Sequence, residues 1–323
     1  MTETPTRMFD RDTTAAEVVQ GVNLSGKLAV VTGGSEGLGL ETARALRSAG
    51  ADLFIGARSA DKLTAAATQL RGEPAGGTVF THPLDLMAPA SVDAFADAVL
   101  ALDRPVDILV NNAGIMAAPK AYTAEGIESQ LATNFVGHAQ LTSRLAGALA
   151  AASGARLVSL TSSGHQISPV LFDDPNFERA HYEPFVAYGQ SKTACALLAV
   201  KAARHLGGRG VTAHAVHPGM IETDLGRFIT DEDRARMAAA MGDHARQMPK
   251  FKTIEAGAAT SVWAATADEL AGKPPLYLED CHVADRIDTR NFAHGVLPYA
   301  LDEDAADKIW TAAETMLGRP LPL

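Results

Sequence analysis

The chain holds few cysteines and no histidine pattern for a metal, which limits the kinds of site it can contain. Only Cys195 and Cys281 occur among 323 residues, and neither lies at a metal-ligand or redox spacing. Two isolated thiols are typical of a reduced cytoplasmic protein, in which both pack as inert groups. Ten histidines are present, but none form His-x-x-x-His or His-Glu-x-x-His. The sequence therefore predicts no metal site.

Positive charge and long apolar runs are also scarce. The 38 acidic residues outnumber the 28 Lys and Arg residues, the formal net charge is −10, and no Lys/Arg-dense block occurs. This balance argues against binding to a nucleic-acid backbone. The longest uncharged stretch, near Leu145–Ala155, is too short to cross a bilayer, and residues 1–12 lack the apolar core of a secretory signal. We therefore expect a soluble, cytoplasmic protein without a membrane span or a nucleic-acid partner.

The chain does contain a regular alternation of short apolar runs and longer helical patterns rich in Ala and Leu. No internal repeat or long Pro/Ser linker interrupts it. The expected strands are Leu28–Thr32, Asp52–Ala57, Thr78–Pro83, Ile108–Asn111, Arg156–Thr161, Thr212–His217 and a short one near Pro275–Leu278. The expected helices are Gly39–Ser48, Ser59–Leu70, Ala90–Leu102, Glu125–Leu149 and Tyr188–Leu206. This pattern predicts a single doubly wound α/β domain, a Rossmann-type parallel sheet with helices on both faces.

Segments outside this alternation flank or interrupt the predicted sheet. The predicted division is an N-terminal arm at 1–24, a dinucleotide-binding catalytic domain at 25–285 with an insertion at 163–187 and a Met-rich lid at 219–249, and a tail at 286–323. We expect a short helix over Ala15–Gln20, capped by the Thr14 hydroxyl, and a tail helix at about Asp302–Leu317. Long excursions beside strand ends are typical of segments that contact substrate.

A glycine-rich turn follows the first strand in Thr32-Gly-Gly-Ser-Glu-Gly-Leu-Gly39. Gly33 permits the tight turn, Gly37 lets the backbone approach a pyrophosphate, and Gly39 lets helix and strand pack closely. The free amides at the start of the following helix would then face the phosphates. A turn of this kind between a strand and a helix indicates a dinucleotide site.

The end of the second strand indicates which nicotinamide cofactor is preferred. An acid there would bond the ribose 2′-hydroxyl, whereas this strand ends in Arg58, whose guanidinium can bind a 2′-phosphate. This favours NADP(H) and leaves NAD(H) open; the alternative is that Arg58 is a solvated surface residue. Glu36 lies near the same region and could weaken binding of the 2′-phosphate. Asp85 could bond the adenine amino group or cap the next helix, and Asn111-Asn-Ala-Gly114 would lie near the adenosine ribose.

Tyr188 and Lys192 stand one helical turn apart, so their side chains lie on one helix face. A phenol normally keeps its proton until about pH 10, but a nearby ammonium favours the phenolate. The pair can then exchange a proton with an alcohol or a carbonyl group nearer neutrality. The same spacing also occurs by chance in many helices, so the other motifs decide its meaning.

Together these motifs resemble the short-chain dehydrogenase/reductase family over roughly residues 14–285. They are the Thr-Gly-x-x-x-Gly-x-Gly turn, Asn111-Asn-Ala-Gly114, Asn134 in Thr-Asn-Phe-Val-Gly, Ser162 after a strand, Tyr188-x-x-x-Lys192 and His217-Pro-Gly219. The long gap between Ser162 and Tyr188 and the entry Thr14-Ala-Ala-Glu-Val-Val-Gln-Gly21 are similar to the retinol-dehydrogenase-like branch, which includes the oxidoreductase domain of WW-domain oxidoreductases.

The resemblance implies a role for each matching residue. Tyr188 would be the acid/base, Lys192 would bond the nicotinamide ribose and favour loss of the Tyr188 proton, and Ser162 would polarise the substrate oxygen. Asn134 would position a water that links Lys192 to solvent, and Thr223 would bond the nicotinamide carboxamide. Ser163 is also a hydroxyl, but His165 follows Ser162 at the spacing of this branch. The predicted cofactor-binding residues are Gly33, Ser35, Gly37, Leu38, Gly39, Arg58, Asp85, Leu86, Asn112, Ala113, Gly114, Tyr188, Lys192, Pro218, Gly219 and Thr223.

These observations predict an NADP-dependent oxidoreductase that interconverts an alcohol and a ketone or aldehyde. We expect an apolar, bulky substrate, because the segments flanking the site are apolar and hold no obvious cation for a carboxylate. The alternatives are a non-catalytic NADP-sensing protein of the same fold and a sugar-nucleotide epimerase or dehydratase. Related enzymes pair through the helices that correspond to Glu125–Leu149 and Tyr188–Leu206, so a homodimer or homotetramer is possible unless the tail blocks it.

Overall fold

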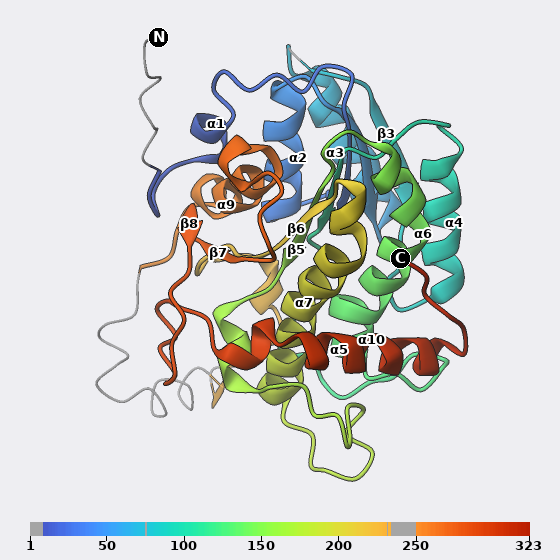
Figure 1. Cartoon of the computed structure of the whole chain (residues 1–323), viewed down its shortest axis with the longest axis vertical. Coiled ribbons are helices and arrows are strands. Elements are labelled where there is room, and N and C mark those ends of the chain that lie inside the picture. Colours follow the sequence, from blue (N-terminus) through green and yellow to red (C-terminus); the bar gives the residue numbers. More distant parts are fainter. Residues whose placement is uncertain (1–8, 75, 231, 234–249) are drawn as a thin grey trace.

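The computed structural model describes residues 9–74, 76–230, 232–233 and 250–323, which are built around one sheet of eight strands (Figure 1). The strand order is β3-β2-β1-β4-β5-β6-β7-β8, and all neighbours are parallel except β7 and β8. The bounds are β1 Leu28–Thr32, β2 Asp52–Ala57, β3 Val79–Pro83, β4 Ile108–Asn111, β5 Arg156–Leu160, β6 Thr212–His217, β7 Tyr277–Glu279 and β8 His282–Val283. The order reverses between β1 and β4, where sheets of this kind bind their ligands.

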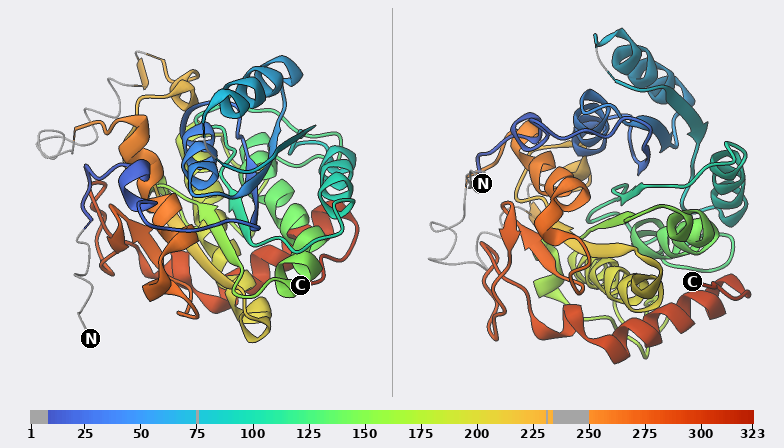
Figure 2. Two further views of the ribbon diagram at one scale, coloured as in Figure 1. Left: turned by 90° about the horizontal axis from the view of Figure 1, so that it is seen from above. Right: turned by 45° about the horizontal axis from the view of Figure 1, so that its top comes forward.

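Helices cover both faces of the sheet, which confirms the predicted doubly wound α/β fold (Figure 2). The helix bounds are α1 Ala15–Val18, α2 Gly37–Ser48, α3 Ala60–Gly72, α4 Pro89–Leu100, α5 Ser129–Leu131, α6 Gly137–Ala151, α7 Pro184–Leu206, α9 Ile254–Thr266 and α10 Glu303–Leu317. Successive residues of β1 point to opposite faces. Leu28 and Val30 pack with α4, α6 and α7, whereas Ala29 and Val31 pack with α1, α2, α3 and α9.

Two predicted helix starts are wrong. The helix predicted over Glu125–Leu149 begins only at Ser129, because a turn precedes it in which Tyr122 pairs with Glu128. The Glu128 carboxylate then accepts the first helical amides. The helix predicted from Tyr188 begins at Pro184, a residue well suited to a first helical turn since its missing amide would have no partner there.

Most other predicted elements agree with the structure to within two residues. The Thr14 hydroxyl caps α1 as predicted, and the Glu17 carboxylate completes a capping box. The antiparallel strand β8 was not predicted, because its two residues are exposed and carry no apolar pattern. Of the predicted lid 219–249, residues 231 and 234–249 lie outside the described residues.

The C-terminal helix α10 lies across α7 on the outside of one helical layer (Figure 1). Ile309, Trp310 and Ala313 are buried in the same core as α7. The Trp310 indole donates to the Leu321 carbonyl at 3.0 Å, and Arg319 pairs with Asp93 of α4 at 2.8 Å. The tail therefore covers a face of the molecule that includes α7.

Candidate active site

The glycine-rich turn joins β1 to α2 at the centre of the sheet. Gly33 has φ +65°, and a Cβ there would lie 2.9 Å from the Asn112 amide nitrogen. A Cβ on Gly39 would lie 2.2 Å from the Gly33 carbonyl oxygen. Only glycine suits both positions. The turn thereby places Gly37 and Leu38, at the start of α2, in the wall of a large pocket.

The end of β4 is held against this turn by hydrogen bonds. Asn112 Nδ2 donates to the Thr32 carbonyl at 2.8 Å, and the Asn112 and Ala113 amides donate to the Thr32 hydroxyl at 2.9 and 3.0 Å. The chain then passes Lys192, since a Cβ on Gly114 would lie 3.5 Å from Lys192 Nζ. The segment after β4 therefore connects the glycine turn, predicted to bind the cofactor, with the predicted Tyr188–Lys192 pair.

Three charged side chains line the pocket beside the end of β2. Arg58 is exposed and makes no hydrogen bond or ion pair with any residue that the structure describes. Glu36, the predicted obstacle to a 2′-phosphate, forms an ion pair with Lys62 of α3 at 2.7 Å. Lys62 was not predicted as a site residue. It lies four residues after Arg58, in the first turn of α3, and this closeness to the strand end was the signal that could have revealed it.

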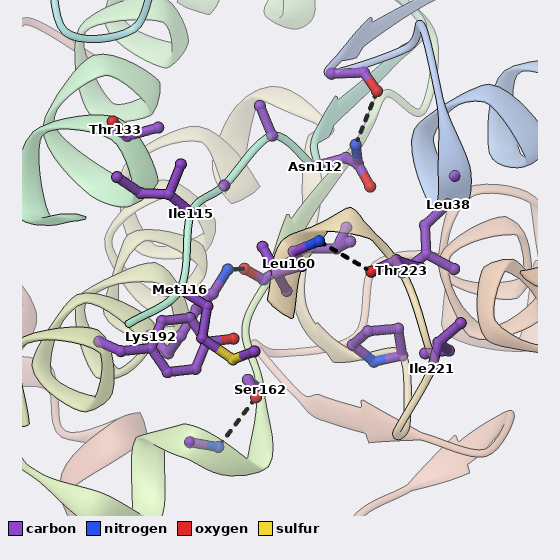
Figure 3. Close-up of a pocket in the computed structure, with 18 of the residues that line it drawn as sticks. Leu38, Asn112, Ile115, Met116, Thr133, Leu160, Ser162, Lys192, Ile221 and Thr223 are labelled. Atoms are coloured by element: carbon purple, nitrogen blue, oxygen red, sulfur yellow. Dashed lines mark hydrogen bonds between the residues drawn. The ribbon is translucent and has the colours of Figure 1, made fainter. Parts of the chain in front are cut away.

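Ser162 and Lys192 line the same cavity near the end of β5 (Figure 3). Tyr188, one helical turn before Lys192 on α7, also lines it. Lys192 Nζ lies 5.8 Å from the centre of the Tyr188 ring and donates to the Leu160 carbonyl at 3.1 Å. Ser162 Oγ accepts the Gly164 amide at 3.0 Å. Gly164 touches the Tyr188 ring so closely that a Cβ there would lie 2.6 Å from Cε1. The same Cβ would lie 3.4 Å from Ser162 Oγ, so the ring and the serine hydroxyl both lie beside Gly164.

Asn134 lies in the π-helix η1, Ala132–Val136, between α5 and α6. Its side chain accepts the Ile115 amide at 2.8 Å and donates to the Ile115 carbonyl at 3.0 Å and to Ser191 Oγ at 2.8 Å. Asn134 thus joins the β4 loop to α7 beside Lys192. It is 1% exposed and does not line the pocket.

All the other predicted site residues line one cavity of about 1410 Å³. Pockets for small ligands measure roughly 300–1,000 Å³, so this cavity has room for a dinucleotide and a second molecule. Figure 3 shows Ser162 and Lys192 on one side of it and Leu38 and Thr223 on the other. Thr223 stands beside the glycine turn, since a Cβ on Gly37 would lie 3.9 Å from its methyl group.

Asp85 lies in the cavity wall, but its carboxylate also has a local role. Asp85 Oδ1 accepts the Met87 amide at 3.0 Å, which closes the turn before α4. The residue that caps α4 is Ala88, so the interpretation of Asp85 as the helix cap is wrong.

The remaining wall of the cavity is mainly apolar and comes from segments far apart in the sequence. Met116, Ile167, Phe185, Ile221 and Phe292 contribute to it. Arg227 and Arg290 also line the cavity, so the flanking segments bring cations to it, although we expected no obvious cation for a carboxylate there. These arginines come from the predicted lid and tail, which could not be placed from the sequence alone.

His165 and His217 adjoin site motifs, but neither lines this cavity. His165 bonds the Ser162 carbonyl at 2.8 Å, and its Nε2 accepts the Leu297 amide at 3.2 Å. His217 Nδ1 accepts the Ser163 amide at 3.3 Å. Burial lowers the pKa of His165 to about 4 and that of His217 to about 3, so both rings are neutral and hold backbone in place.

An open parallel sheet with a glycine turn and a helix start at the point where its strand order reverses has the architecture of dinucleotide-dependent enzymes. The comparisons with known proteins specify the family. The model for "short chain dehydrogenase" matches residues 27–234, and the chain belongs to the short-chain dehydrogenase/reductase family of oxidoreductases.

Individual relatives agree with this assignment. The chain is 44% identical to a "Probable oxidoreductase" of Streptomyces lividans, over 90% of this chain and 97% of the relative. It is 35% identical to human retinol dehydrogenase 12, over 92% and 88% of the two chains. A blue fluorescent protein from a metagenomic library, solved in complex with NADPH, is 27% identical and superposes with a TM-score of 0.62, over 80% of this chain and 98% of that one.

Other classes of site find no support in the described parts of the chain. No group of three or more His, Cys, Asp or Glu side chains there could hold a metal ion. Among the helices described, none has the length and apolar character needed to cross a membrane.

Proposed function

We propose that the protein is an NADP-dependent oxidoreductase that interconverts an alcohol and a ketone or aldehyde, with Tyr188 as the acid/base. The observation that carries this proposal is the meeting of Ser162, Tyr188 and Lys192 in the cavity that the glycine turn also lines. The turn fits a pyrophosphate, because Gly37 and Leu38 bring the start of α2 and its free amides to the cavity wall, where Gly37 carries no side chain. When bound, the nicotinamide supplies or accepts a hydride.

The side chains of the site are suited to hold the substrate oxygen and move its proton. Ser162 Oγ accepts the Gly164 amide, so its own proton is available to the substrate oxygen. Tyr188 would donate its proton to the same oxygen as negative charge develops there, which stabilises the transition state more than the ground state. Lys192, whose Nζ lies 5.8 Å from the centre of the Tyr188 ring, would bond the nicotinamide ribose. Asn134 would position the water that returns the proton.

Charge near the end of β2 supports a preference for NADP(H) over NAD(H). Arg58 has no partner among the described residues and can bind a 2′-phosphate. The ion pair with Lys62 offsets the negative charge of Glu36. The similar protein solved with NADPH supports the same cofactor.

We further propose a bulky, largely apolar substrate. The cavity wall carries Met116, Phe185 and Phe292, and the name of retinol dehydrogenase 12 describes an enzyme for an apolar alcohol. Arg227 and Arg290 allow a polar group at one end of that substrate.

The position of the tail bears on how copies of the chain could assemble. Because α10 covers α7, a homodimer or homotetramer paired through α6 and α7 would first have to displace the tail.

A panel assay tests the proposal. The absorbance of NADPH and of NADH is followed with aromatic, aliphatic and steroid-like carbonyl compounds, and of NADP+ and NAD+ with the matching alcohols. We expect turnover of the bulkier apolar pairs, with higher kcat/KM for the phosphorylated cofactor. Tight NADPH binding without turnover of any pair would instead favour the alternative, a non-catalytic cofactor sensor.

A further inference from the structure

His138 is the second residue of α6, and both of its ring nitrogens have partners inside the protein. The side chain is 2% exposed. Nδ1 lies 2.8 Å from the main-chain carbonyl oxygen of Asn134, one helical turn earlier. Nε2 lies 2.8 Å from the hydroxyl of Thr32, the residue that begins the glycine turn. This histidine therefore bridges the predicted proton-handling asparagine and the predicted cofactor turn.

The partners determine where the ring carries its proton. A carbonyl oxygen only accepts hydrogen bonds, so Nδ1 must carry the hydrogen and donate it to Asn134. Nε2 of a neutral ring is then an acceptor, and the Thr32 hydroxyl donates to it. The Thr32 oxygen in turn accepts the Asn112 and Ala113 amides. The Val110 carbonyl, the other acceptor near this hydroxyl, is more distant at 3.4 Å.

The ring stays neutral over the pH range in which proteins normally work. Burial lowers the pKa of His138 to about 4, and the charge of Lys192 acts in the same direction, whereas the bond to Asn134 opposes both. Cys195 Sγ, on α7, also contacts the Asn134 carbonyl at 3.1 Å. No acidic side chain forms an ion pair with His138 in the part of the chain described. The neutral His138 ring thus keeps its hydrogen on Nδ1.

Each end of the bridge supports a different part of the site. Asn134 holds Ile115 and Ser191, the residue before Lys192, so the Nδ1 bond supports the chemical end. Thr32 holds Asn112 and Ala113 beside the glycine turn, so the Nε2 bond supports the cofactor end. We infer that His138 is a positioning residue for the oxidoreductase reaction, which fixes Asn134 through Nδ1 and the cofactor turn through Nε2.

Two substitutions of His138 test its two hydrogen bonds one at a time. The amide of Asn in His138→Asn stands near the position of Nδ1 and retains the donor to Asn134, whereas the longer His138→Gln reaches the position of Nε2 and retains a partner for Thr32. We expect His138→Gln to lower kcat about tenfold with the KM for NADPH nearly unchanged, and His138→Asn to raise that KM about tenfold with kcat nearly unchanged.

His205 supplies the matched control. Its Nδ1 also lies 3.0 Å from the main-chain carbonyl oxygen of Lys201, four residues earlier. The His205 ring, however, is exposed on α7 and does not line the cavity. His205→Asn and His205→Gln should leave kcat and KM unchanged. If both His138 variants change kcat and KM by the same factor, or lose stability without changing either constant, the inference is wrong.

A measurement on the unaltered protein keeps the inference testable if the variants do not fold. Nitrogen NMR of histidine-labelled protein should show His138 and His165 as buried rings protonated at Nδ1, and His214 and His217 as buried rings protonated at Nε2. Finding only one buried Nδ1-protonated ring would overturn the assignment. The inference rests on the proposed function, but an unaltered protein without any turnover would refute that function and leave the NMR result to decide the bridge.

Discussion

Three side chains, Arg58, Glu36 and Lys62, set the charge beside the end of β2. Lys62 is paired with Glu36, and both are about half exposed, so solvent screens their attraction. Arg58 stands beside them without a partner among the described residues. A bound 2′-phosphate would meet the available guanidinium of Arg58 and the ammonium of Lys62, which is already paired with Glu36. The larger share of the cofactor preference should therefore come from Arg58.

Replacing Arg58 tests this reasoning directly. Because hydrogen bonds to charged groups contribute about 1.5–3 kcal/mol, Arg58→Ala should lower kcat/KM for NADPH by about tenfold to a hundredfold. The value for NADH should change by less than about threefold, since the 2′-hydroxyl does not need the cation. Lys62→Ala should have a smaller effect, because Glu36 already satisfies part of that charge.

The control is Lys273→Ala, an exposed lysine that does not line the cavity, which should leave both values unchanged. An equal loss with NADPH and NADH in Arg58→Ala would contradict the assignment of this residue to the 2′-phosphate.

Local patterns predicted Arg58, the glycine turn and the Tyr188–Lys192 pair, because each is a short spacing on one strand end or helix. The sequence could not reveal the pairing of Lys62 with Glu36, 26 residues apart, since it depends on how α3 packs beside the turn. The contact between His138 and Thr32 spans 106 residues and was missed for the same reason. Residues that support the site from a distance require the folded chain.

At the scale of elements, the chain between β4 and α6 differs most from its prediction. The Ala-rich pattern predicted one helix, but Glu128 ends a turn and caps α5, and η1 then interrupts the helical hydrogen bonding at Asn134. π-Helical turns inside helices often mark functional sites. Glu128 also accepts the Tyr182 hydroxyl at 3.1 Å, which ties the predicted insertion to α5. Burial raises the pKa of this carboxyl, and the hydrogen bonds that it accepts, from the Gln130 and Leu131 amides among others, oppose that rise without cancelling it.

The short helix η2, Ser163–Ile167, should control the position of the Tyr188 ring. A methyl group in Gly164→Ala would lie 2.6 Å from Tyr188 Cε1, so the ring would have to move away from residue 164 and leave its present position. We expect kcat to fall by at least about tenfold, because a misplacement of about 1 Å can cost a hundredfold in rate. Cofactor affinity, measured by fluorescence titration with NADPH, should change little.

Gly147→Ala in α6 is the matched control, since nothing lies within 4 Å of the added methyl group. This variant should keep full activity and gain about 0.5–1 kcal/mol of stability, the usual advantage of Ala over Gly inside a helix. Wild-type kcat in Gly164→Ala would show that Tyr188 is not held in place by η2.

At the scale of the whole molecule, four buried histidines connect stability to pH. Burial lowers the pKa of His138, His165 and His214 to about 4 and that of His217 to about 3, against about 6.5 in an unfolded chain. Between these values the unfolded chain binds protons that the folded chain does not. Stability is therefore complete above about pH 6.5 and falls as the pH decreases toward 4.

Urea unfolding at several pH values measures this effect. Each histidine should lower the free energy of unfolding by up to about 1.4 kcal/mol per pH unit within the window. Burial raises the pKa of Glu128 and Glu279, so their protonation stabilises the folded chain as the pH falls. We expect the four histidines to outweigh these two carboxyl groups. A free energy that stays constant or rises between about pH 6.5 and 4 would contradict the buried, neutral state of these rings.

The overall architecture was predictable because apolar strands buried on both faces and amphipathic crossover helices have strong local signatures. The position of the C-terminal tail could not be predicted. Trp310 and Ile309 could have faced any apolar surface, and only the structure shows that they cover α7. Arg290 and Phe292 reach the cavity by the same kind of long-range packing, so the substrate-facing wall was the least predictable part of the site.

In the proposed reaction, Tyr188 transfers the proton that accompanies hydride transfer. The measurement that tests it most directly is kcat of Tyr188→Phe with NADPH and the best carbonyl substrate, together with NADPH affinity and thermal unfolding. Tyr122→Phe, at an exposed tyrosine outside the cavity, is the control. We expect Tyr188→Phe to lower kcat by about a hundredfold or more while folding and NADPH affinity are retained, and Tyr122→Phe to keep normal turnover. Wild-type turnover in a folded Tyr188→Phe protein would contradict it.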